Sequence, residues 1–90
     1  YNGINIMSYT NINNPFIIPS DGYITTTARN NDYIRVTVFN SNPNNYISCN
    51  SLGNDYSGMV QSIFVKKGMK AYVSDVNNGQ KALAIFSPMV

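Results

Sequence analysis

Ninety residues can build one hydrophobic core, so the length excludes a second domain within this chain. Hydrophobic residues make up 43% of the chain, charged residues only 11%, and the formal net charge is +2. The six Lys and Arg residues are scattered along the sequence, which argues against a nucleic-acid partner because phosphate binding needs a dense basic cluster.

The remaining polar residues are mostly Asn, Ser and Thr, and about one residue in six is Asn. A surface of amides and hydroxyls suits a secreted or virion-borne protein better than a cytosolic one, whose surface is normally rich in Lys and Glu. With one cysteine, Cys49, the chain has no intrachain disulfide. Because small domains without such links have marginal stability, we expect self-association.

The chain starts at Tyr1 and shows no basic leader of a signal peptide. No stretch approaches the roughly 18 apolar residues of a membrane span, so membrane insertion is not expected. We expect residues 1–90 to form a single β-sandwich domain at the C-terminal end of a longer chain.

Apolar and polar residues alternate with a period of two along most of the chain, which is typical of half-buried strands. The clearest strand is 33–39, in which Ile34, Val36 and Val38 share the face predicted to point into the core. The predicted fold class is all-β, a jelly-roll-like antiparallel β-sandwich of about eight short strands. The eight predicted strands are residues 4–9, 16–18, 22–28, 33–39, 46–49, 60–65, 70–76 and 82–86.

Two turns suggest local pairing of strands. Residues 29–32 resemble a hairpin turn after strand 22–28. Asn78 and Gly79 both tolerate positive φ, as a type I′ turn requires, so strands 70–76 and 82–86 are predicted to pair as a hairpin.

Enzymatic activity is not expected, and no cofactor or metal is implied. The chain has no histidine, the commonest general base and metal ligand. Asp21 and Asp32 lie in turn sequences, where a carboxylate usually bonds to nearby backbone. Cys49 follows an apolar run and is predicted to be a buried thiol.

Tyrosine and asparagine are the residues that best fit a ligand site. A tyrosine ring can stack on the C–H face of a sugar, while asparagine amides supply paired donors and acceptors. Both gather in two predicted loops, where recognition commonly occurs; the alternative is that Asn makes turns and Tyr lines a subunit interface. The candidate ligand-binding residues are Asn42, Asn44, Asn45, Tyr46, Asn54, Asp55 and Tyr56.

The last segment, residues 83–90, is apolar on both faces. A sandwich strand has only one inner face, so we expect a neighbouring copy of the chain to cover the other, and Pro88 to mark the end of the strand. The candidate interface residues are Leu83, Ile85, Phe86 and Met89.

Three short motifs give a family resemblance. Residues 19–23 read Pro-x-Asp-Gly-aromatic, residues 65–68 read Val-Lys-Lys-Gly, and residues 86–89 read aromatic-x-Pro-apolar. Over residues 16–90 the chain resembles the small β-sandwich domains at the C-terminal ends of bacteriophage tail fibres and related receptor-binding proteins. Met69 departs from the pattern, which usually has an acidic residue after the glycine.

The resemblance implies a homotrimer at the tip of a tail fibre, displayed outside the cell on a virion and recognising a host-surface saccharide. Two alternatives stay open. One is a structural cap that only trimerises the fibre, and the other is a carbohydrate-binding appendage of a secreted glycosidase.

Overall fold

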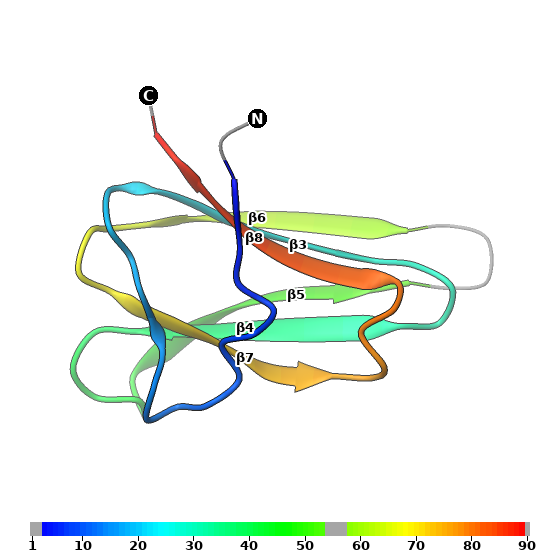
Figure 1. Ribbon diagram of the computed structural model, residues 1–90, viewed down its shortest axis with the longest axis horizontal. Helices are drawn as coiled ribbons and strands as arrows, with labels where there is room; N and C mark the ends of the chain where they lie inside the picture. Colours follow the sequence, from blue (N-terminus) through cyan, green and yellow to red (C-terminus); the bar gives the residue numbers. More distant parts are fainter. Residues whose placement is uncertain (1–2, 54–57, 90) are drawn as a thin grey trace.

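The computed structural model describes residues 3–53 and 58–89, which form two antiparallel four-stranded sheets packed face to face (Figure 1). The first sheet has the order β1-β8-β3-β6 and the second β2-β7-β4-β5. The chain changes sheet at every connection except that between β4 and β5, and this is the jelly-roll arrangement. The predicted fold class is confirmed. The strands are β1 Ile4–Asn5, β2 Phe16–Ile17, β3 Gly22–Ala28, β4 Tyr33–Phe39, β5 Tyr46–Leu52, β6 Met59–Val65, β7 Lys70–Val76 and β8 Ala82–Pro88.

Strand β4 shows how the alternating sequence builds the sandwich. Ile34, Val36 and Val38 are at most 1% exposed and point into the core, as predicted. The residues between them point to the opposite face of the second sheet. This outer face therefore carries the polar and aromatic positions of β4.

The N-terminal segment is less regular than predicted. The backbone N–H of Ile6 donates to Ala84 O on β8 at 3.0 Å, whereas Tyr9 O accepts from Val73 N on β7 at 2.7 Å. The chain thus crosses from the first sheet to the second between these residues. Strand β1 is correspondingly only two residues long, because a strand cannot continue in one sheet while the chain moves to the other.

The prediction that β7 and β8 form a hairpin is wrong. β7 lies between β2 and β4 in the second sheet, and β8 lies between β1 and β3 in the first. Of the two turn residues only Gly79 has positive φ, at 76°, whereas a type I′ turn needs two such residues. The Asn78-Gly79 segment connects the two sheets.

The prediction of a hairpin turn at residues 29–32 is also wrong in its pairing. Asn30 and Asn31 both have positive φ, at 54° and 64°, and Asp32 N donates to Arg29 O at 3.1 Å. The turn is tight, but it joins β3 of the first sheet to β4 of the second (Figure 1).

Strand β8 has one core face and one outer face. Phe86 is 1% exposed and its ring lies 5.8 Å from that of Phe16 on β2. The prediction of an interface role for Phe86 is therefore corrected: its side chain fills the core of its own chain. Leu83 and Ile85 point outward and are half-buried, and Met89, past the strand, is 51% exposed. Pro88 ends the strand, as predicted.

The predicted burial of Cys49 is confirmed. The thiol is fully buried, and burial raises its pKa even though a hydrogen bond with Thr26 acts in the opposite direction. A thiol in this environment is a small core side chain rather than a nucleophile.

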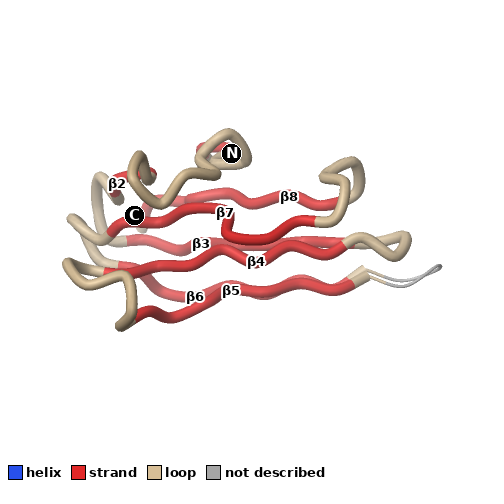
Figure 2. The backbone as a smooth tube through the Cα atoms, turned by 90° about the horizontal axis from the view of Figure 1, so that it is seen from below, coloured by secondary structure: helices blue, strands red, loops and turns tan. Residues whose placement is uncertain are grey.

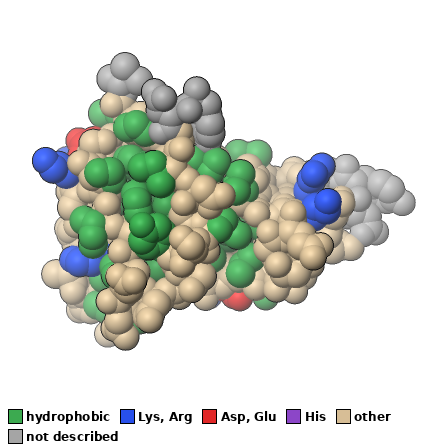
Figure 3. Space-filling model, viewed as in Figure 1, with side chains coloured by type: hydrophobic (Ala, Val, Ile, Leu, Met, Phe, Trp, Pro, Cys, Tyr) green, Lys and Arg blue, Asp and Glu red, His purple; other side chains and the backbone are tan. Residues whose placement is uncertain are grey.

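The exterior follows the composition. On the face shown in Figure 3, charged side chains are few and lie toward the margins, while uncharged polar groups and hydrophobic side chains cover the rest. The described residues contain no helix long and apolar enough to cross a membrane.

Candidate functional site

The outer face of the second sheet gathers aromatic, hydroxyl and charged side chains. In the order seen in Figure 2, β7, β4 and β5 lie side by side. Register places the outward residues in three cross-strand rows. Side chains in one row lie close enough to contact the same ligand. The rows are Lys70–Phe39–Tyr46, Tyr72–Thr37–Ser48 and Asp75–Arg35–Asn50.

A β-bulge in β7 shapes this face. Val36 pairs with Val73 but the preceding residue, Arg35, pairs with Asp75, so Ser74 is the extra residue. Its Oγ accepts from Thr37 Oγ1 at 2.7 Å and from Arg35 Nε at 3.4 Å, and donates to Arg35 O at 3.2 Å. Bulges commonly re-aim side chains next to functional sites. Here the bulged residue Ser74 accepts the hydrogen bond that orients the Arg35 side chain.

A hollow of about 370 Å³ lies on this face, and we call it the tyrosine hollow. Its lining residues come from β4, β7 and the start of β5, and from the β1–β2 and β4–β5 loops. Arg35 is the only charged residue among the described residues that line it. The lining residues are Ile12, Arg35, Thr37, Pro43, Asn44, Tyr46, Tyr72 and Ser74.

Aromatic packing supports the tyrosines from the sheet. The Tyr72 ring meets Phe39 edge to face, with centroids 6.2 Å apart and an interplanar angle of 79°. Lys70 Nζ lies 5.9 Å from the Phe39 centroid and donates to Asn40 O at 2.7 Å. Tyr46, in contrast, is 55% exposed. The Tyr72 ring is therefore held by Phe39, whereas the Tyr46 ring is open to a ligand.

The predicted ligand residues separate into three groups. Asn44 and Tyr46 line the tyrosine hollow. Asn45 lines a second hollow of about 420 Å³ that shares Tyr46. Asn42 stabilises the turn in the loop: its Oδ1 accepts from Asn44 N at 3.0 Å, and its carbonyl oxygen accepts from Asn45 N at 3.0 Å. This is the turn-forming role that was the alternative to ligand binding. Asn54, Asp55 and Tyr56 lie outside the described residues.

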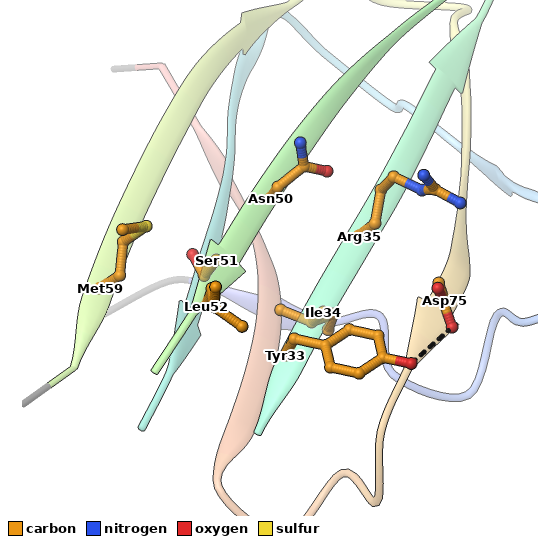
Figure 4. A pocket seen from close by; sticks show the side chains of 8 residues that line it. All are labelled: Tyr33, Ile34, Arg35, Asn50, Ser51, Leu52, Met59 and Asp75. Carbon is orange, nitrogen blue, oxygen red and sulfur yellow. Dashed lines mark hydrogen bonds between the residues drawn. The ribbon is translucent and has the colours of Figure 1, made fainter. Parts of the chain in front are cut away.

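A third hollow, of about 260 Å³, shares Arg35 with the tyrosine hollow. Figure 4 shows Tyr33 and Arg35 reaching from β4 toward Asp75 on β7, and Tyr33 OH donates to Asp75 Oδ1 at 3.4 Å. Leu52 and Met59 complete its apolar side. This hollow therefore extends from Arg35 on the outer face around the edge strand β5 to Met59 on β6 of the first sheet.

Sequence reasoning missed most of the hollow. Alternation in strand 33–39 already placed Arg35 and Thr37 on the outer face, and Tyr72 alternates in the same way in strand 70–76. These positions could have been found by asking which polar residues share a face with Tyr46. Ser74 follows Lys70 and Tyr72 in the same alternation. Asp75 could not have been found, because the bulge at Ser74 brings it into the outward row of Arg35.

Asp21 and Asp32 bond to backbone, but only the bond from Tyr33 to Asp32 is local as predicted, and the other donors lie in distant loops. Asp21 Oδ1 accepts from Lys67 N at 2.8 Å. Asp32 is fully buried, and its carboxylate accepts from Tyr33 N at 2.8 Å, Asn78 N at 3.2 Å and Lys81 N at 3.1 Å. Burial alone would raise the pKa of Asp32, but these backbone donors outweigh it and lower the pKa. Both carboxylates thus tie loops together.

The described residues contain no cluster of three or more His, Cys, Asp or Glu side chains that could hold a metal ion. Comparison with protein-family models, with curated proteins and with solved structures found no match for this chain. The chemistry of the outer face is therefore the basis for a functional assignment.

Proposed function

We propose that this chain is a non-catalytic saccharide-binding module whose ligand lies in the tyrosine hollow. One observation carries the proposal: Tyr46, Tyr72 and Asn44 come together beside Arg35 in a concave site on a rigid sheet. Such a site combines flat apolar surfaces with a few polar groups that fix orientation, which is the usual makeup of small-ligand sites.

Each group has a role suited to a sugar ring. The exposed Tyr46 ring stacks on the C–H face of the sugar, and Asn44 offers a carbonyl acceptor and an amide donor to neighbouring hydroxyls. Arg35 has five N–H donors, and the bond from Nε to Ser74 orients its guanidinium. Because Ser74 holds Arg35 and Phe39 holds Tyr72 before the ligand arrives, these two side chains lose little conformational entropy on binding.

The resemblance of residues 16–90 to phage receptor-binding domains supplies the setting of the proposal. In that setting the module sits at the tip of a homotrimeric tail fibre, outside the cell, and its ligand is a saccharide of the host surface. A carbohydrate-binding appendage of a secreted glycosidase would use the same hollow in the same way, so the binding experiment applies to both settings.

A glycan array probed with the labelled chain tests the proposal. We expect binding to a defined set of glycans, and loss of that binding by at least about tenfold for Tyr46→Ala, as is typical of a central aromatic contact. Tyr23→Ala is the matched control, because Tyr23 is also an exposed strand tyrosine, 42% exposed, on the outer face of the other sheet.

Two results would contradict the proposal. One is a folded chain that binds no glycan on the array. The other is an equal loss of binding for Tyr46→Ala and Tyr23→Ala, which would show that the glycan does not bind in the tyrosine hollow.

A further inference from the structure

Arg35 has hydrogen-bond donors that the sheet does not use. The residue is exposed, and it brings the only charge to the described lining of the tyrosine hollow. Its Nε donates to Ser74 Oγ at 3.4 Å, but among the described residues its two terminal amino groups have no partner. These two groups carry four of the five N–H donors of a guanidinium, and they remain for a ligand in the hollow.

The positive charge of Arg35 is not neutralised on the side of the tyrosine hollow. Asp75 is paired with Arg35 in the sheet register, but it lines the third hollow and not the tyrosine hollow. Its carboxylate accepts from Tyr33 OH at 3.4 Å (Figure 4), and neither Asp75 nor Arg35 forms an ion pair with another described residue. Lys70 adds a second positive charge to the same outer face. An anion that enters the tyrosine hollow therefore meets positive charge.

The geometry of a guanidinium suits an acidic group better than a hydroxyl. Its planar fork offers two parallel N–H bonds to two oxygens of the same acidic group. Such charge-assisted bonds are about twice as strong as bonds between neutral groups. Because Nε of Arg35 is already bonded to Ser74, the pair of terminal amino groups is the edge that can make this contact.

We propose that the ligand of the tyrosine hollow is an acidic saccharide, whose carboxylate or sulfate group accepts two hydrogen bonds from the terminal amino groups of Arg35. The inference rests on the proposed function, since it names the class of saccharide that the same site takes. The Tyr46 and Tyr72 rings, which line the hollow with Arg35, contact the apolar face of the sugar. Arg35 then selects sugars by their charge.

A glycan array with matched pairs tests the inference. Each carboxylated glycan is paired with its uncharged methyl ester, and each sulfated glycan with its unsulfated form. We expect the acidic member of a pair to bind about tenfold more tightly or better, and the pairs that show this preference identify the acidic group. Arg35→Gln should remove the preference by weakening the binding of the acidic member alone. Arg35→Lys keeps the charge but not the fork, so it should retain only part of the preference.

Arg29→Gln is the matched control, because Arg29 is also an exposed arginine but lies in the β3–β4 turn, outside the tyrosine hollow. It should bind glycans like the unmodified chain, and the urea midpoint of each variant checks that it is folded. An equal loss of preference in Arg29→Gln and Arg35→Gln would overturn the inference, because the preference would then come from overall charge.

Equal binding of the acidic and neutral members of every pair would also overturn the inference. If that binding is still lost in Tyr46→Ala, the proposed function stands and only the acidic class is wrong. A folded chain that binds no glycan overturns both.

Discussion

The hydroxyl of Thr26 on β3 lies 2.7 Å from the hydroxyl of Ser51 on β5, and the pair links the two sheets inside the core. Both side chains are at most 2% exposed. Ser51 Oγ also donates to the carbonyl of Thr26 at 2.9 Å, so the Thr26 hydroxyl is the donor between the two side chains. The bond therefore has a direction, and the two residues are not equivalent.

We expect Ser51→Ala to destabilise the fold more than Thr26→Val. Ser51→Ala leaves the buried Thr26 hydroxyl with only Cys49 Sγ, a weak acceptor 3.4 Å away, at a cost of about 1–3 kcal/mol. Thr26→Val removes the hydroxyl but leaves Ser51 its carbonyl acceptor, so the cost is about 1 kcal/mol.

Urea unfolding of the two single variants and the double variant measures these costs. The double variant should lose less than the sum of the singles, because removing both partners leaves no unsatisfied hydroxyl donor. Equal losses for the two single variants would contradict the assigned direction of the bond.

Asp32 makes stability depend on acid pH. Its pKa is lowered in the folded protein, so the carboxylate stabilises the fold fully above the unfolded-state pKa of about 3.9. That contribution is lost as the pH falls through the lower, folded-state pKa. Asp32→Asn should cost about 1–3 kcal/mol at pH 7, because an uncharged amide replaces a carboxylate that accepts several backbone bonds.

Unfolding experiments at neutral pH and at about pH 2.5 check this expectation. The difference between the two pH values should be smaller in Asp32→Asn than in the unmodified chain. Asp75→Asn is the matched control, because Asp75 is exposed and receives only a tyrosine hydroxyl among the bonds described. An equal effect of both variants on the pH dependence would show that Asp32 is not its source.

Cys49 should resist thiol reagents while the chain is folded. The thiol is fully buried and its pKa is raised, so modification requires opening of the sandwich. An opening free energy of only about 3 kcal/mol slows modification more than about 100-fold. The rate of reaction with a disulfide reagent, measured with and without urea, checks this. Cys49→Ala gives the background because the chain has no other cysteine, and rapid labelling without urea would contradict the expectation.

The strands were predictable because alternation is a local property. Ile34, Val36 and Val38 reveal their common face within one segment, and each of the eight predicted segments contains a strand, although segment 4–9 is strand only at residues 4–5. Pairing was not predictable from the turns: Asn78-Gly79 and Asn30-Asn31 do reverse the chain, but a reversal can lead to the same sheet or to the opposite one. Which occurs depends on long-range contacts such as those of Asp32 with Asn78 and Lys81.

The candidate site was predictable only where loop composition was informative. Asn44 and Tyr46 were found because Asn44 belongs to an Asn-rich loop and Tyr46 directly follows it. Tyr72 comes from a strand 26 positions later in the chain and joins them only through the pairing of β7 and β5 with β4. Phe86 was misplaced for a related reason: an apolar residue in a short strand does not reveal which face is inward until the partner strand is known.

Tyr72 gives the sharpest test of how the hollow binds its ligand. If the ring stacks on a sugar, Tyr72→Phe should keep affinity within a few-fold, because the ring and its edge contact with Phe39 remain. Tyr72→Ala should lower affinity about tenfold or more, equivalent to about 1.4 kcal/mol. Titration calorimetry with the glycan selected on the array measures both, and the urea midpoint of each variant separates binding from stability. A loss in Tyr72→Phe as large as in Tyr72→Ala would mean that the hydroxyl, and not the ring, holds the ligand.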